Sequence, residues 1–186
     1  MDNGASSYRR FRDRGDDNAF AELIRLYRDG LIFYLYSIVG NIHIAEEIAE
    51  DTFVLLGTKK PKDKGDGTFK TWLYTIGRNL AVSYLRKYAK RQEISIDDCL
   101  DLADETESMY EMLVAEQRKT MLHKAMSNLK TEYRQVLHLV YFEGFSNKEA
   151  ATVMKRSVHN VETLLYRARK SLKTQLEREG FTYEEL

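Results

Sequence analysis

The stretch FKTWLYTIGRNLAVSYLRKYAKR, which runs from Phe69 to Arg91, interleaves aromatic and basic side chains and contains no acidic residue. Its apolar residues recur at three- and four-residue steps, and this spacing predicts an amphipathic helix with one face toward a core. Aromatic rings can stack on unpaired bases and cations can neutralise phosphates, so the same helix suits a nucleic acid. Composition alone favours a plainer interpretation, a core helix with a solvated basic face.

The charges of the 186-residue chain balance, with 29 Lys plus Arg and 29 Asp plus Glu. They are unevenly spread, because residues 92–117 contain many acids and no Lys or Arg. The flanking blocks are therefore basic on balance, which gives a basic–acidic–basic layout. Hydrophobic residues make up 43% of the chain, and one Pro with ten Gly favours a mostly helical protein.

Several classes of chemistry are disfavoured. A single cysteine, Cys99, can form neither an internal disulfide nor a cysteine metal site. The acids that follow His43 suggest a carboxylate metal site, but helical bundles with such sites carry Glu-x-x-His pairs. None of the His residues has a carboxylate three positions earlier, and no phosphate-cradling glycine loop or nucleophile elbow occurs. We therefore expect no catalytic residue, no metal and no cofactor.

The N-terminal residues do not resemble a targeting segment. Residues 1–15 are polar and rich in Arg, so we expect a loose arm or the frayed start of a helix. They lack the apolar core of a signal peptide, and no apolar run in the chain is long enough to span a bilayer. These features predict a cytoplasmic protein without membrane insertion.

The first half of the chain has the spacing of a small helical domain. The predicted helices span about residues 19–39, 44–56 and 68–91. Residues 57–67 (GTKKPKDKGDG) read as a loop because of their glycines and proline. We assign residues 1–91 to a first domain and residues 92–110, which are acidic with weak periodicity, to an extended linker.

The second half, residues 111–186, carries the pattern of a helix-turn-helix at residues 146–170. Ser146 and Glu149 form a capping box, and a three-residue break follows the short helix. The second helix of the pair would enter a DNA major groove. The residues expected to meet DNA there are Ser157, His159, Asn160, Glu162, Thr163, Arg167 and Arg169. Helical hairpins in bundles can imitate this pattern.

Three segments carry a resemblance to a known family. EGFSNKEAATVMKRSVHNVETLLYRARKSL resembles the region-four helix-turn-helix of bacterial extracytoplasmic-function sigma factors. AFAELIRLYRDGLIFYLYSIVGNIHIAEEIAEDTFVLL is similar to their region two, and TFKTWLYTIGRNLAVSYLRK to its promoter-melting segment. The segments occur in the family's order and spacing. The chain departs from the pattern at a few positions, namely Glu50, Gly77, Ser83, Glu162 and Leu164.

The resemblance implies an all-α fold, with two small helical domains joined by the acidic linker. It implies core RNA polymerase as a partner, through the clamp helices of the largest subunit and the beta flap, together with promoter DNA and an anti-sigma factor. The implied polymerase-binding residues are Glu46, Glu47, Glu50, Asp51 and Phe53. A flipped promoter base needs stacking partners and its backbone needs cations. The region-two residues assigned to DNA are Lys59, Lys60, Lys70, Trp72, Tyr74, Arg78, Asn79, Arg86 and Lys87.

The function implied is that of a transcription initiation factor, which binds core RNA polymerase and directs promoter recognition and melting. Two alternatives come from the residues themselves. A conventional helix-turn-helix regulator would bind operator DNA tightly without polymerase, usually as a dimer. A helical adaptor would bind only protein and would have no effect on a promoter.

Overall fold

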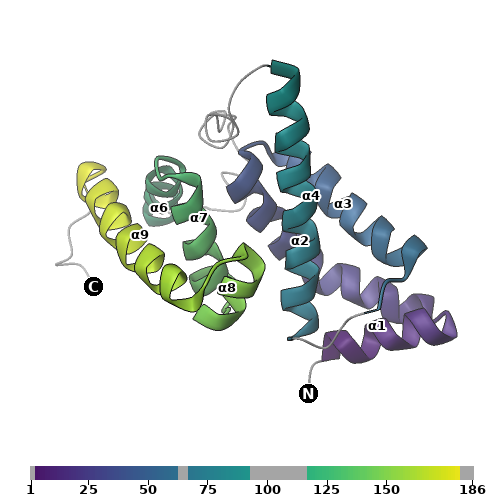
Figure 1. Cartoon of the computed structure of the whole chain (residues 1–186). Helices are drawn as coiled ribbons and strands as arrows, with labels where there is room; N and C mark the ends of the chain where they lie inside the picture. Colours follow the sequence, from purple (N-terminus) through teal and green to yellow (C-terminus); the bar gives the residue numbers. More distant parts are fainter. Residues whose placement is uncertain (1–2, 63–66, 93–116, 181–186) are drawn as a thin grey trace.

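The computed structural model describes residues 3–62, 67–92 and 117–180, and the regular structure in these ranges is entirely helical (Figure 1). This confirms the all-α fold class. The helices of the first half are α1 (Asn3–Arg14), α2 (Asp17–Val39), α3 (Ile42–Lys59) and α4 (Phe69–Gln92). Those of the second half are α6 (Gln117–Ser127), α7 (Thr131–Leu137), the π-helical turn η1 (His138–Phe142), α8 (Asn147–Met154) and α9 (Val158–Arg178). The predicted linker, apart from Gln92, lies outside the described residues.

The ends of α2 and α3 follow from local capping chemistry. The side chain of Asp16 accepts a hydrogen bond from the backbone N of Ala19 at 3.0 Å, which satisfies a free amide at the start of α2. Gly40 ends the same helix in the left-handed conformation, with φ of 70°. Asn41 then caps α3 by accepting from the backbone N of Ile44 at 3.2 Å. The predicted break between these helices is confirmed.

The N-terminal segment was expected to be a loose arm or the frayed start of a helix, and the structure rules out the loose arm. It forms α1, because Tyr8 and Phe11 are buried by the rest of the first half. The ring of Tyr8 lies 5.5 Å from that of Phe69, and Phe11 stacks on Phe20 at 4.3 Å between ring centroids. Two large apolar residues are too few to show a helical periodicity in the sequence. A helix this short is stabilised mainly by its tertiary contacts, here with aromatic partners far along the chain.

The loop before α4 is shorter than predicted. Helix α3 continues through Gly57 to Lys59, and Lys60 ends it in the left-handed conformation. At the far side of the loop, the Thr68 side chain accepts from the backbone N of Thr71 at 3.2 Å and so caps the start of α4. A glycine inside a helix costs only about 1 kcal/mol relative to alanine, which neighbouring contacts can offset.

The core of the first half lies between α2, α3 and α4. Leu35, Leu56 and Leu73 are fully buried and represent one helix each. Gly77 permits the close approach of α4 to α2, because a Cβ atom there would lie 3.0 Å from Cδ1 of Leu31. An alanine at this position would require only a small shift of the Leu31 side chain.

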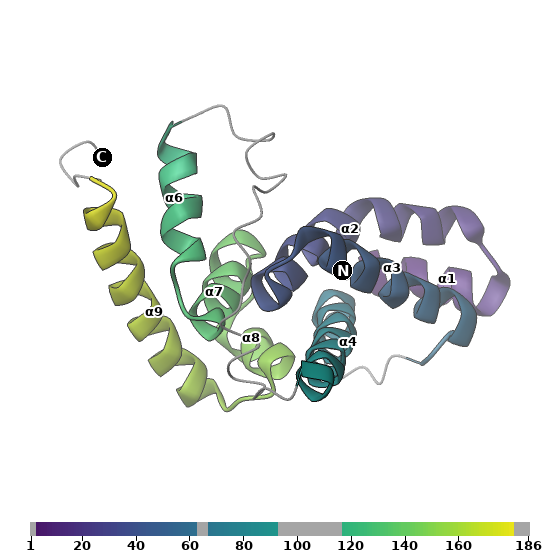
Figure 2. The same ribbon diagram turned by 90° about the horizontal axis from the view of Figure 1, so that it is seen from above.

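The two halves of the chain pack against each other. Helix α4 contacts α8, and α2 contacts α7, as Figure 2 shows from above. One hydrophobic cluster includes Tyr74 from the first half and Phe145 from the second, whose rings lie 5.1 Å apart. Residues far apart in sequence therefore share a continuous core.

Candidate nucleic-acid and polymerase interfaces

Helices α8 and α9 form the predicted helix-turn-helix. Both halves of the capping box are present at Ser146 and Glu149, as predicted. Lys155 adopts the left-handed conformation with φ of 54°, and this reverses the chain between the helices. Ser157 caps α9 by accepting from the backbone N of Asn160 at 3.2 Å. One residue expected to touch DNA therefore also begins the recognition helix.

The recognition helix presents its predicted DNA-contacting residues to solvent. Val161, Leu164 and Ala168 are buried and hold α9 against the second half. The predicted set from Ser157 to Arg169 is exposed, with the exception of the half-buried Thr163. Tyr166 is also on this surface and is 65% exposed. The spacing of the buried residues thus determines which side of α9 is available to a ligand.

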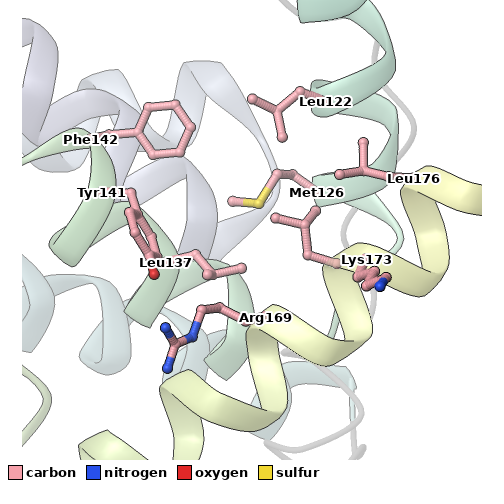
Figure 3. Close-up of a pocket in the computed structure, with 9 residues that line it drawn as sticks. Leu122, Met126, Leu137, Tyr141, Phe142, Arg169, Lys173 and Leu176 are labelled. Carbon is pink, nitrogen blue, oxygen red and sulfur yellow. The ribbon is translucent and has the colours of Figure 1, made fainter. Parts of the chain in front are cut away.

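A second surface of α9 lines an apolar groove. The groove has a volume of about 300 Å³, and its side chains converge from α6, α7, η1 and α9 in Figure 3. The lining residues are Leu122, Met126, Leu137, Tyr141, Phe142, Arg169, Leu172, Lys173 and Leu176. Tyr141 and Phe142 are about half exposed, at 56% and 48%. Apolar surface of this kind marks binding sites for proteins, and Arg169 borders it as well as the DNA side.

The acidic surface of α3 is largely as predicted. Glu47, Glu50 and Asp51 are exposed, and Glu46 is half-buried with its carboxylate 3.6 Å from Nδ1 of His43. Phe53, which was expected on this surface, instead belongs to the core and is 6% exposed. The residue after it, Val54, is 58% exposed. The helical period explains the difference, because Phe53 follows Ala45 and Ala49 on the buried side of α3.

The predicted nucleic-acid residues of the first half differ in accessibility. Exposed residues are Lys59, Lys60, Arg86 and Lys87, and half-buried ones are Trp72, Arg78 and Asn79. The Trp72 ring packs 5.3 Å from Tyr8, so part of it belongs to the core. The Arg78 guanidinium lies near the hydroxyl of Tyr34; burial raises the pKa of that hydroxyl, and Arg78 partly opposes the shift.

Lys70 and Tyr74 contact the second half directly. The carboxylate Oε2 of Glu143 accepts from the Tyr74 hydroxyl at 2.6 Å and lies 2.8 Å from Nζ of Lys70. Nε2 of His138 lies 3.5 Å from the other carboxylate oxygen. Burial opposes ionisation of Glu143, but His138, Lys70 and Tyr74 favour it and lower its pKa to about 2. Sequence reasoning missed Glu143, because its partners lie some 70 residues earlier in the chain.

The described ranges contain no group of His, Cys, Asp and Glu side chains that could hold a metal ion. Nor do they contain a helix long and apolar enough to cross a membrane.

Comparisons with known proteins agree with this arrangement. The Sigma-70 region 2 family matches residues 23–91, and the Sigma-70, region 4 family matches residues 119–172. ECF RNA polymerase sigma factor SigW of Bacillus subtilis is 28% identical over 174 residues, covering 88% of this chain and 91% of the relative. ECF RNA polymerase sigma factor SigM of the same organism is 29% identical over 157 residues, covering 82% and 91% respectively.

Solved structures share the fold. The sigma factor RpoE, in complex with the anti-sigma factor NepR from Bartonella quintana, matches with a TM-score of 0.70 and 23% identity, covering 85% of this chain and 96% of that one. CnrH, in complex with the cytosolic domain of CnrY, matches with a TM-score of 0.64 and 24% identity, covering 95% and 99%. With regions two and four present in order and relatives matched over most of their length, the chain belongs to the extracytoplasmic-function group of sigma-70 factors, initiation factors that bind core RNA polymerase and direct it to promoters.

Proposed function

We propose that separate surfaces of this sigma factor bind the polymerase and the promoter. The observation that carries the proposal is the exposed row of polar side chains on α9, which is the second helix of the helix-turn-helix and packs on the second half through its opposite side. Residues 1–91 and 111–186 would each act on one promoter element, with the acidic residues 92–110 joining them. The factor would have no catalytic activity of its own and would act in the cytoplasm.

The DNA surface of the second half would read base edges in a major groove. His159 and Asn160 lie in the first turn of α9, where recognition helices contact bases. Glu162 can accept a hydrogen bond from the amino group of a cytosine. Arg167 lies farther along α9 and would contact phosphate, which positions the helix without adding sequence information.

The nucleic-acid surface of the first half would hold the melted strand. Lys59 and Lys60 lie at the end of α3, beside the loop that leads to α4, and both are exposed. Arg86 and Lys87 are exposed on the C-terminal half of α4. Cations in this arrangement can follow a single-strand backbone, and a partly accessible Trp72 can stack on a base.

Two further surfaces would bind the polymerase. The exposed carboxylates of Glu47, Glu50 and Asp51 would meet cationic residues of the clamp helices, with Val54 adding apolar contact. The groove beside Tyr141 and Phe142 would take an apolar helix of the beta flap. Arg169 and Lys173 at this groove would favour an occupant with some negative charge.

An anti-sigma factor is the expected regulator. The two solved structures described above were determined in complex with an anti-sigma factor and with a cytosolic partner domain, respectively. A polypeptide that covers the surfaces of α3 or the groove would prevent polymerase binding. A pull-down with purified candidate proteins tests this regulation.

The decisive experiment is run-off transcription over genomic promoter fragments with purified core polymerase, with and without this protein. We expect discrete transcripts only when the protein is present. A conventional regulator would instead bind duplex DNA tightly and specifically without core polymerase. The proposal would be contradicted if the protein bound promoter DNA with the same nanomolar affinity with and without core polymerase and produced no new transcripts.

A further inference from the structure

Glu143 of the second half occupies a site built by the first half. Nζ of Lys70 contacts Glu143 twice, at 2.8 Å from Oε2 and at 2.7 Å from the backbone carbonyl oxygen. The Tyr74 hydroxyl donates to Oε2 at 2.6 Å. Only 13% of the Glu143 side chain is exposed. Both donors come from α4, one helical turn apart, so they converge on one anionic oxygen.

The backbone around Glu143 has an unusual form that presents this carboxylate. Residues 138–142 form a π-helical turn, and the backbone N of Glu143 donates to the carbonyl of His138 at 3.0 Å. Gly144 follows with φ of +68°, a conformation that favours glycine. Such wide turns are rare and are often found at functional positions. Here the turn places Glu143 against α4.

Gly30 on α2 leaves room for the contact. A Cβ atom at Gly30 would lie 2.6 Å from the Tyr74 hydroxyl oxygen and 2.7 Å from Oε1 of Glu143. Glycine is unfavourable inside a long helix, so its presence in α2 needs a compensating reason. Close approach of the Tyr74–Glu143 pair supplies that reason. Gly30 of the first half therefore leaves the space that Glu143 of the second half occupies.

Other contacts hold the same arrangement. Oε1 of Glu149 lies 3.4 Å from the hydroxyl oxygens of Thr68 and Thr71. The ammonium of Lys70 lies 5.1 Å from the centre of the Phe145 ring. These contacts place α8 and the turn before it across the N-terminal half of α4, which carries five of the residues assigned to the promoter.

An ammonium and a phenol that converge on an anionic oxygen suit a nucleic-acid phosphate as well as a carboxylate. We propose that Lys70 and Tyr74 form a binding site for a phosphate of the promoter strand, and that Glu143 fills this site while the two halves are packed together. Packing of the halves and promoter binding at α4 then exclude each other. This inference rests on the proposed role of α4 in promoter binding and assigns its ligand group.

The main test is Glu143→Gln in the full-length chain. The variant loses the charge that Lys70 and Tyr74 bind, so the two halves should separate more often. We expect a larger radius of gyration in solution scattering and about tenfold tighter binding of the free protein to single-stranded promoter DNA. Circular dichroism should show the helix content of the native protein.

Glu179→Gln provides a matched control. Glu179 also belongs to the second half and also pairs with a lysine, Lys124, at 2.9 Å, but both partners lie in that half. The substitution makes the same change of net charge. It should leave the radius of gyration unchanged and should shift DNA binding by less than about twofold. An equal gain in both variants would mean that net charge alone is responsible.

Gly30→Ala tests the site from the other side without changing charge. The added methyl group should push the Tyr74–Glu143 pair apart, while alanine improves the helix propensity of α2. We expect a larger radius of gyration, as for Glu143→Gln, but a smaller gain in DNA binding, because the methyl group also crowds the Tyr74 hydroxyl of the proposed site. Unchanged scattering and unchanged DNA binding in both variants would overturn the inference.

Lys70→Ala in the assembled holoenzyme separates this inference from the proposed function. If Lys70 binds a promoter phosphate, promoter opening should fall about tenfold. Normal opening by Lys70→Ala would refute the role of this residue in the proposed function and would also overturn the inference. Reduced opening, combined with no effect of Glu143→Gln on the free protein, would overturn the inference alone.

Discussion

Two regions were expected to bind nucleic acid, and their surroundings differ. The predicted residues at the start of α9 stand in solvent, supported only from their buried side. In the first half of α4, Lys70 is partly covered and Tyr74 is fully buried beneath the second half. Both regions carry suitable side chains, but only one is free to meet a ligand in this arrangement. Residue type therefore shows what a helix can bind, and packing determines when it can do so.

The largest expected effect comes from removing the support of α9. Leu165→Ala deletes a side chain that is 6% exposed and leaves a cavity beneath the recognition residues. We expect a loss of about 3 to 4 kcal/mol in the free energy of unfolding, measured by urea denaturation. The adjacent Tyr166→Ala is the control, because that side chain is 65% exposed. It should change stability by less than about 0.5 kcal/mol, and a similar loss in both variants would contradict the difference between the two faces of α9.

The break between α2 and α3 and the starts of α2, α8 and α9 could be predicted from sequence because local chemistry sets them. Asp16, Gly40 and Ser146 satisfy helix ends within four residues of themselves. Such signals lie within one short window of the chain and act in the same way in most proteins. The helix-turn-helix and the exposed face of α9 follow from the same local patterns.

The covered state of α4 could not be predicted in this way. Tyr74 is aromatic and lies among basic residues, which suits a base-stacking position, but it is buried by partners far along the chain. Phe53 was assigned to the polymerase surface by the resemblance alone, although its spacing puts it with the apolar residues of α3, and the structure buries it. Long-range packing decides the case of Tyr74, and no single window of sequence contains it, whereas the local helical period is enough to place Phe53 on the buried side of α3.

Acid should uncover α4, and so make it as accessible as α9, by breaking the contact between Glu143 and α4. The pKa of this carboxyl is lowered from 4.5 to about 2, so its ionised form stabilises the packed arrangement above about pH 4.5. That stabilisation is lost as the pH falls from 4.5 toward 2. Each unit corresponds to about 1.4 kcal/mol, so the whole shift is of the order of 3 kcal/mol. Only the part that comes from Lys70 and Tyr74 belongs to the packing of the halves, because His138 lies in the same half as Glu143.

Solution scattering at constant salt between pH 6 and about 3 measures this opening. Glu143→Gln should have a weaker transition in this range, because its side chain cannot titrate. An identical transition in the variant would show that other carboxylates control the packing of the two halves.

A charge reversal on α3 changes a surface that is exposed whether the two halves are packed together or separated, so it tests polymerase binding apart from the covering of α4. Glu47→Lys with Asp51→Lys should weaken binding to core polymerase roughly tenfold, since like charges would then face the clamp helices. Surface changes of this kind alter stability little. Affinity for core polymerase is measured in a pull-down or by fluorescence anisotropy.

The matched control is Glu22→Lys with Asp29→Lys on α2, which reverses two exposed acids outside the predicted dock. Equal weakening by both pairs would indicate a general charge effect. No weakening by the α3 pair, with intact circular dichroism, would remove α3 as the polymerase surface.

The smallest effect is expected from the loss of a single hydrogen bond beneath the N-terminal end of α4, where α1 supports it. The buried Tyr8 hydroxyl donates to the carbonyl oxygen of Pro61 at 2.9 Å, and its ring lies 5.3 Å from that of Trp72. Tyr8→Phe keeps the ring and removes only the hydrogen bond, so we expect a loss of about 1 kcal/mol in urea denaturation. Tyr8→Ala removes both and should cost about 3 kcal/mol or more. Equal losses would mean that the hydrogen bond holds α1 and the aromatic packing adds little. A loss of stability in Tyr8→Ala but not in Tyr8→Phe would mean that ring contacts alone hold α1 in place. Helix α4 would then be supported by apolar packing on the side of α1 and by charged contacts on the side of α8.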